Sequence, residues 1–183
     1  KMKNYNTLIL LVAGKSKRFG GKIKKQFIKV DNKPIFIHTL INVLKFKFDN
    51  IVLVTSKDEI KNIKRYIEKE DCINSANKKI MHYIEGGSER VCSVYNAVKY
   101  LNDNNIKTDY VFIHDGVRPL VAKKEILSLY NYILENDAAI LASKVVDTIK
   151  KADDNKNITE TVDRTYLYRA ATPQAFNFTK YLK

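Results

Sequence analysis

The sequence predicts an α/β protein built on a doubly wound, mostly parallel sheet, and two patterns carry that prediction. Short apolar or β-branched runs alternate along the chain with stretches whose apolar residues recur every three or four positions. The first run, Leu-Ile-Leu-Leu-Val at residues 8–12, is apolar throughout, which is typical of a strand buried on both faces. Strands that alternate with helices are joined by right-handed crossovers, so most of them lie parallel.

Each predicted element follows from its own stretch of sequence. Strands are predicted where large aliphatic and β-branched side chains cluster, at residues 7–12, 51–55, 80–85, 110–114 and 138–143. Helices are predicted between them on the periodic apolar residues, at 37–44, 60–67, 94–101 and 126–133. We interpret these apolar stripes as helix faces packed on the sheet.

The alternation breaks between residues 144 and 168. Residues 145–149 and 159–166 are predicted to be strands, and residues 151–157 between them carry strong turn chemistry in Asp-Asp-Asn-Lys-Asn. The pattern predicts a β-hairpin arm inserted after the last strand of the sheet. From the pattern alone, the arm could contact a second subunit or could cover an edge of its own sheet.

Length, charge and cysteine content limit the class of protein. A chain of 183 residues suffices for one well-packed α/β domain, and we predict a single domain over residues 1–183. The net charge of +13 favours anionic ligands, but the lysines are scattered and form no stripe of the kind that nucleic-acid binding requires. Cys72 and Cys92 lack metal-ligand spacing, which predicts a reduced, cytoplasmic setting. Because no apolar run reaches spanning length, we expect no membrane insertion.

The first strand leads directly into a small, basic loop. Ala13, Gly14 and Ser16 are small enough for backbone N–H groups to approach an anionic oxygen, and Lys15 and Arg18 add countercharge. Ligands of open α/β sheets bind at the carboxyl ends of the strands, so the loop predicts a polyphosphate site. Its spacing matches neither the Walker pattern nor the dinucleotide fingerprint. Taken alone, the segment also fits a solvated loop after an ordinary strand.

Further segments follow this loop in a recognisable order. They read Gly-Gly-Ser-Glu-Arg at 86–90, His-Asp-Gly-Val-Arg-Pro at 114–119, Val-Asp-Thr-Ile-Lys at 146–150, Thr-Val-Asp-Arg at 161–164 and Ala-Thr-Pro-Gln-Ala-Phe at 171–176. Together with the loop, they resemble the successive signatures of the 2-C-methyl-D-erythritol 4-phosphate cytidylyltransferases over nearly the whole chain. The resemblance implies a Rossmann-like nucleotidyltransferase sheet and the condensation of CTP with 2-C-methyl-D-erythritol 4-phosphate, in isoprenoid precursor synthesis. The products would be the CDP-alcohol and pyrophosphate.

Two other functions remain open at this stage. The ribitol-5-phosphate cytidylyltransferases are closely similar, and Val117 resembles that branch, whereas Glu89-Arg90 and the 161–164 segment favour the methylerythritol branch. A basic nucleic-acid-binding domain without catalysis is the alternative from another class. The scattered lysines, and the arginines that lie within the motif segments, argue against it.

The implied reaction needs no nucleophilic side chain, because a phosphate monoester is itself a competent nucleophile at neutral pH. Positioning two anions and neutralising charge on the α-phosphate of CTP are the main tasks. By resemblance, the catalytic residues are Arg18 and Lys25. Nucleotide binding is implied for Ala13, Gly14, Lys15, Ser16, Gly87, Ser88 and Ser93. Binding of the polyol phosphate is implied for Asp115, Arg118, Thr148 and Arg164.

The resemblance also implies a cofactor and a partner, and the sequence departs from the family's usual pattern at three places. Mg²⁺ would be held mainly by the CTP phosphates, without dedicated protein ligands. The arm at 144–168 would form the contact of a homodimer. The enzyme would act in the cytoplasm or, in a eukaryote, in a plastid-type organelle. Ser16 and Lys24 stand where the family usually has glycine and proline. The C-terminal portion of the typical family domain, which carries a further substrate-binding lysine, is absent from this chain.

His114 is expected to form a structural hydrogen bond rather than to act as a base.

Overall fold

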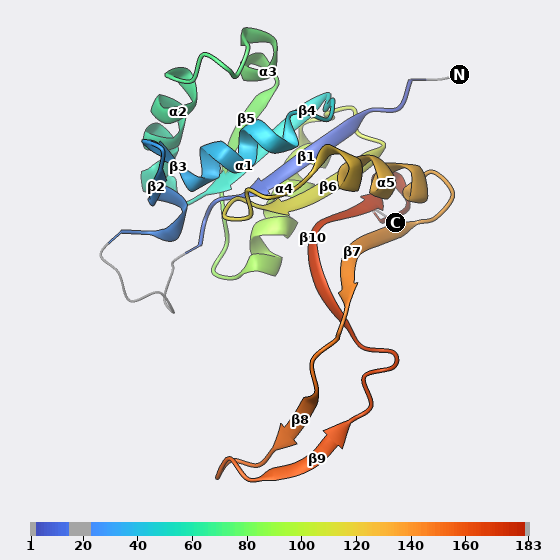
Figure 1. Ribbon diagram of the computed structural model, residues 1–183. Helices are drawn as coiled ribbons and strands as arrows, with labels where there is room; N and C mark the ends of the chain where they lie inside the picture. The colour runs from blue at the N-terminus through green and yellow to red at the C-terminus, as the bar shows by residue number, and fades with distance from the viewer. Residues whose placement is uncertain (1–2, 15–22, 182–183) are drawn as a thin grey trace.

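Six strands form the central sheet of the computed structural model, which describes residues 3–14 and 23–181 (Figure 1). Their order across the sheet is β5 (Met81–Glu85), β4 (Asn50–Thr55), β1 (Asn6–Leu11), β6 (Tyr110–Asp115), β10 (Tyr168–Asn177) and β7 (Ala138–Lys144). The first four strands are parallel, and β10 runs antiparallel to both of its neighbours. The mostly parallel sheet is therefore confirmed, and all five predicted strands are found within one residue of their expected ends.

Helices cover both faces of this sheet, as a doubly wound fold requires. One face carries α1 (Ile35–Val43), α2 (Ile60–Glu68) and α5 (Lys123–Ile133), and the other carries α4 (Arg90–Asp103) and α6 (Phe178–Tyr181). Successive residues of β1 supply the two cores in turn: Leu8 and Leu10 pack against the first group and Ile9 against the second. Burial of β1 on both faces explains why its sequence is apolar without alternation.

Strand β10 and several short elements were not predicted. The segment at 171–176 lies within β10, although a proline argues against a central strand. The structure accommodates Pro173 where the pairing of β10 with β7 shifts register, between Ala170 and Gln174. The short elements are η1 (Lys25–Phe27), β2 (Lys29–Val30), β3 (Lys33–Pro34), η2 (Lys57–Glu59) and α3 (Ser75–Lys79).

The predicted arm is present, but its strands are shorter than expected and displaced. They are β8 (Ile149–Ala152) and β9 (Ile158–Val162), which pair only with each other and extend away from the sheet (Figure 1). The expected first strand, 145–149, was wrong except at its last residue. The second ends early because Asp163 Oδ1 accepts hydrogen bonds from the N–H and hydroxyl of Thr165, at 2.9 and 2.6 Å, which turns the chain.

Among the described residues, no helix is long and apolar enough to cross a membrane.

Candidate active site

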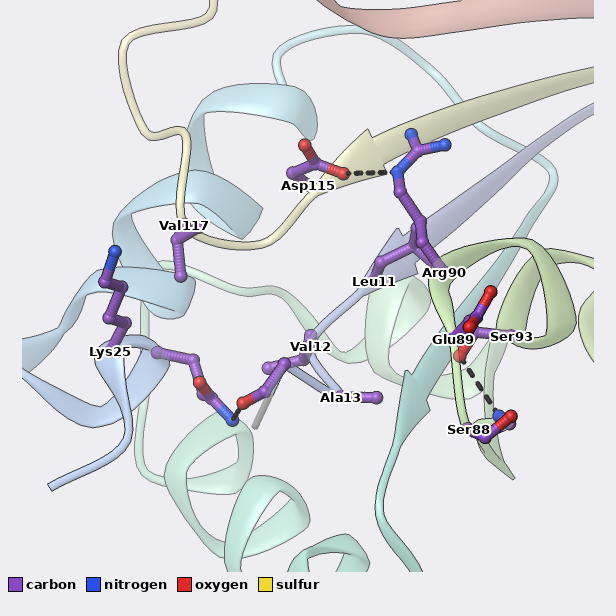
Figure 2. A pocket seen from close by; sticks show the side chains of 13 residues that line it. Leu11, Val12, Ala13, Lys25, Ser88, Glu89, Arg90, Ser93, Asp115 and Val117 are labelled. Atoms are coloured by element: carbon purple, nitrogen blue, oxygen red, sulfur yellow. Dashed lines mark hydrogen bonds and ion pairs between the residues drawn. The ribbon is translucent and has the colours of Figure 1, made fainter. Parts of the chain in front are cut away.

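A cavity of about 550 Å³ opens where β1 and β6 end and α4 begins (Figure 2). It gathers segments from the first strand, the 86–90 motif and the 114–119 motif, which are far apart in sequence. Its lining residues are Leu11, Val12, Ala13, Gly14, Lys25, Gln26, Gly87, Ser88, Glu89, Arg90, Ser93, Asp115 and Val117. Seven of the predicted site residues are thus brought together. They are Ala13, Gly14, Lys25, Gly87, Ser88, Ser93 and Asp115.

The start of the basic loop is held by hydrogen bonds to two elements. The backbone N–H of Val12 donates to the carbonyl of Val54 at 2.7 Å, which continues the pairing of β1 with β4. The buried Gln26 side chain donates from Nε2 to the carbonyl of Gly14 at 3.3 Å. Because Gln26 lies in η1 beside Lys25, this contact joins the two ends of the predicted phosphate loop. Lys15, Ser16 and Arg18 lie outside the described residues.

Lys24 takes the backbone geometry of the proline that it replaces. Its φ of −63° is the value that a proline ring imposes. Its ammonium group lies 2.9 Å from Glu59 Oε1, and the Glu59 side chain is only 18% exposed. An ion pair to η2 therefore secures the position before Lys25, where the family usually relies on a ring.

The Gly86-Gly87 pair lets two parts of the cavity wall pack closely. The backbone N–H of Gly87 donates to Ser93 Oγ at 3.1 Å, across the first turn of α4. A Cβ on Gly87 would lie 2.3 Å from Cys92 Cβ, and one on Gly86 would lie 2.9 Å from Ala13 Cβ. Both positions therefore require glycine for packing. Cys92 packs against Gly87 here as a small residue.

Asp115, the last residue of β6, is held between two arginines. Its Oδ1 accepts from Arg90 Nε at 3.2 Å, and its Oδ2 accepts from Arg118 Nε at 3.1 Å (Figure 2 draws the first contact). The carboxylate is 24% exposed and the guanidinium-bearing side chains are about half exposed. Arg90 was given no binding role in the sequence analysis. The signal for it was its place in the 86–90 motif.

His114 is buried directly beneath this cluster. Its Nε2 lies 3.0 Å from the carbonyl of Arg118, and because a carbonyl only accepts, Nε2 carries the proton. Burial lowers the pKa of His114 and keeps the imidazole neutral. The expected structural hydrogen bond is confirmed, and it fixes the turn that leads from Asp115 to Arg118.

The buried histidine predicts a loss of stability in mild acid. The unfolded chain takes up a proton below about pH 6.5, whereas folded His114 with its lowered pKa does not, so the free energy of unfolding falls as the pH falls. Between pH 7.5 and 5.5 the loss is at most about 1.4 kcal/mol for one histidine. Urea unfolding at both pH values measures it. His114→Gln should flatten the dependence; an unchanged dependence would contradict the assignment. Burial also lowers the pKa of His82, which contributes with the same sign and remains in the variant.

The two arm residues do not line this cavity. Thr148 precedes β8 and Arg164 follows β9, on the hairpin that extends away from the sheet (Figure 1). Arg118 does not line the cavity, but its Nε donates to Asp115, which does. Of the predicted acceptor-binding residues, Asp115 and Arg118 therefore lie together, and Thr148 and Arg164 lie on the arm.

Comparison with known proteins identifies the family. The family model described as 2-C-methyl-D-erythritol 4-phosphate cytidylyltransferase matches residues 7–183. The chain belongs to this family. This cytidylyltransferase is 38% identical over 174 residues to the 2-C-methyl-D-erythritol 4-phosphate cytidylyltransferase of Thermotoga neapolitana, covering 94% of this chain and 73% of the relative. It is 39% identical over 171 residues to that of Clostridium botulinum, covering 93% and 72%.

Solved structures agree with this assignment. The cytidylyltransferase superposes on 4-diphosphocytidyl-2C-methyl-D-erythritol synthase from Anaerococcus prevotii with a TM-score of 0.76 and 31% identity, covering 98% of this chain and 77% of that one. The bifunctional IspDF of Campylobacter jejuni gives a TM-score of 0.76 at 29% identity, covering 96% of this chain and 42% of that one. The enzyme class, nucleotidyltransferase, and the Rossmann-like fold are thereby established.

Proposed function

We propose that the cavity at the ends of β1 and β6 is where this chain performs its reaction. That reaction is the condensation of CTP with 2-C-methyl-D-erythritol 4-phosphate to the CDP-alcohol and pyrophosphate, in isoprenoid precursor synthesis. One observation supports the placement above the others: Ala13, Gly14 and Lys25 face the 86–90 motif and Asp115 across a single cavity. The arrangement offers a phosphate loop, a nucleoside pocket and an acceptor side next to one another.

The reaction at this site is a displacement at phosphorus. A phosphate oxygen of the acceptor attacks the α-phosphorus of CTP, a new P–O bond forms, and the bond to the bridging oxygen of pyrophosphate breaks. Negative charge increases on the α-phosphate and on the leaving group. In our proposal Lys25 and Arg18 neutralise that charge, and backbone donors of residues 13–16 bind the triphosphate. No side chain has to remove a proton.

The nucleoside and the acceptor occupy opposite sides of the cavity in this proposal. Gly87, Ser88 and Ser93 lie on the α4 side, where in this proposal they bind the pyrimidine and favour it over a purine. Asp115 and Arg118 lie at the end of β6, where a carboxylate and a guanidinium can bind hydroxyl and phosphate groups. Lys25 lines the same cavity as both of these sides.

We propose that Mg²⁺ enters this site with CTP. In the part of the chain that the structure describes, no three His, Cys, Asp or Glu side chains are grouped to hold a metal ion. Both oxygens of Asp115 already accept hydrogen bonds from arginines. Phosphate oxygens of CTP are suitable ligands for Mg²⁺, which is usually bound through substrate phosphates and few carboxylates.

We further propose that the enzyme is a homodimer formed through the arm. Large apolar side chains lie exposed along and beside the arm: Val146, Ile158, Tyr166 and Tyr168 are 60 to 86% exposed. A two-stranded hairpin is only marginally stable unless its apolar side is covered, and a symmetric partner covers both arms at once. The dimer would bring Thr148 and Arg164 to the partner's cavity.

We propose that the enzyme acts in the cytoplasm, because its two cysteines, Cys72 and Cys92, are unbridged. The bacterial relatives give no support to a plastid location. The single domain also remains our proposal, for a chain that spans 73% of the Thermotoga relative. Ribitol phosphate transfer and nucleic-acid binding are not favoured over the family's reaction.

Pyrophosphate release tests this function. With Mg²⁺ and CTP, we expect rapid pyrophosphate release with 2-C-methyl-D-erythritol 4-phosphate as the acceptor. The kcat/KM for ribitol 5-phosphate should be at least about tenfold lower, because each misplaced acceptor contact costs about 1.4 kcal/mol or more. ATP in place of CTP should give only background release. Faster turnover of ribitol 5-phosphate would show that ribitol 5-phosphate is the preferred acceptor. Tighter binding of ATP than of CTP in calorimetry would contradict the proposed preference of the cavity for a pyrimidine nucleotide.

A further inference from the structure

The contact between Arg90 and Asp115 joins the two sides of the cavity, and Arg90 has no role in the reaction described above. Arg90 is the first residue of α4, two residues after Ser88 of the Gly87-Ser88 turn on the nucleoside side. Asp115 ends β6 on the acceptor side. Their side chains meet across the cavity at 3.2 Å, between Arg90 Nε and Asp115 Oδ1.

The same guanidinium also reaches a third element. Arg90 Nη2 donates to Gln174 Oε1 of β10 at 3.4 Å, so the planar group is fixed at two points. On the other side of the carboxylate, Arg118 Nε donates to Oδ2 at 3.1 Å. The plane of the Asp115 carboxylate is therefore set from both sides, and its remaining lone pairs are directed by these two contacts.

The first turn of α4 carries the contact to each side of the cavity. Ser93, three residues after Arg90, accepts from the backbone N–H of Gly87, which fixes the nucleoside turn. The residue that contacts Asp115 and the residue that fixes the nucleoside turn therefore belong to the same turn of α4.

We propose that Arg90 is a positioning residue that orients the Asp115 carboxylate for the acceptor. The role rests on the proposed function of the cavity. It depends on the forked shape of the guanidinium, since Nε binds Asp115 while Nη2 binds Gln174. A lysine carries the same charge but has a single ammonium group at its end, and it cannot hold both partners in this geometry.

The test separates acceptor binding from nucleotide binding in Arg90→Gln, with Arg65→Gln as the matched control. Arg65 lies exposed on α2, where it contacts Asn62 and the ring of Tyr66, and it does not line the cavity, so its replacement removes the same charge outside the site. We expect Arg90→Gln to raise the KM for the polyol phosphate about tenfold or more, the effect of one lost charge-assisted hydrogen bond, while the Kd for CTP alone changes less than about threefold. Arg65→Gln should leave both values unchanged.

Three further variants distinguish positioning from charge or from folding. Arg90→Lys should keep the raised KM for the polyol phosphate, and Gln174→Ala should raise this KM by a smaller factor. The variant that combines Arg90→Gln with Gln174→Ala should have the same KM as Arg90→Gln alone, because one contact depends on the other. Thermal unfolding of each variant should stay near the wild-type midpoint; if Arg90→Gln unfolds, Gln174→Ala carries the test alone.

Full rescue by lysine, or an acceptor KM within threefold of the wild type, would overturn the proposal. A parallel loss of CTP affinity and thermal stability would do the same. Failure of the wild-type chain to release any pyrophosphate would instead overturn the function, so the two failures are distinguishable.

Discussion

Replacing Lys25 by alanine is expected to lower kcat about a hundredfold or more while the protein stays folded. Lys25 lines the cavity from η1, on the opposite side from the 86–90 motif (Figure 2). In the proposed reaction its ammonium group neutralises charge that increases only in the transition state, so the loss falls on kcat rather than on KM alone. Steady-state pyrophosphate release and a thermal unfolding midpoint for the same preparation measure both parts of the expectation.

Lys29→Ala provides the matched control for this prediction. Lys29 lies exposed on the short strand β2 and does not line the cavity, so its replacement removes the same charge from a nearby surface. Wild-type kcat is expected for this variant, because exposed substitutions away from a site have small effects. Equal turnover of Lys25→Ala and wild-type enzyme would mean that the reaction centre is elsewhere.

Mixing two inactive variants is expected to restore activity if the arm acts across a dimer. Lys25→Ala removes a residue of the cavity, and Arg164→Ala removes a residue of the arm. If Arg164 serves the partner's cavity, each mixed dimer has one site with both residues intact and one site with neither. Random exchange at equal concentrations should then recover about a quarter of the wild-type activity, since half of the dimers are mixed.

The control mixture pairs Lys25→Ala with a variant that carries both replacements. Every cavity in that mixture lacks Lys25, so no activity should return, although the subunits exchange in the same way. No recovery in the first mixture, together with a monomer mass in light scattering, would show that the arm folds against its own domain.

The parts of the fold that were predictable from sequence are those where burial dictates composition. Strand β1 is covered on both faces, and its residues Leu8, Ile9 and Leu10 are almost fully buried, so the sequence there is apolar without exception. The arm has no such constraint. Strand β8 reads Ile-Lys-Lys-Ala and is largely exposed, which leaves neither a buried face nor an alternation to locate its ends.

The candidate site was predictable one segment at a time, but its cross-links were not. The loop after β1 and the 86–90 motif could be identified because small residues before a helix or after a strand have a direct structural meaning. The contact between Arg90 and Asp115 joins positions 25 residues apart, and the Gln174 contact spans 84 residues. No spacing rule links such positions. Only the order of the strands in the sheet brings them together.

The pairing of Lys24 with Glu59 has a consequence for how this loop can evolve. A proline at position 24 restricts the backbone by its own ring, and a mutation elsewhere leaves that restriction in place. Here the position depends on ion pairs of the Lys24 ammonium group, which lies 2.9 Å from Glu59 Oε1 and 3.9 Å from Asp58 Oδ2. Positions 24 and 59 should therefore change together in this lineage: a return to proline at 24 frees position 59 from the need for a carboxylate, whereas loss of Glu59 first would leave Lys24 only the longer contact to Asp58.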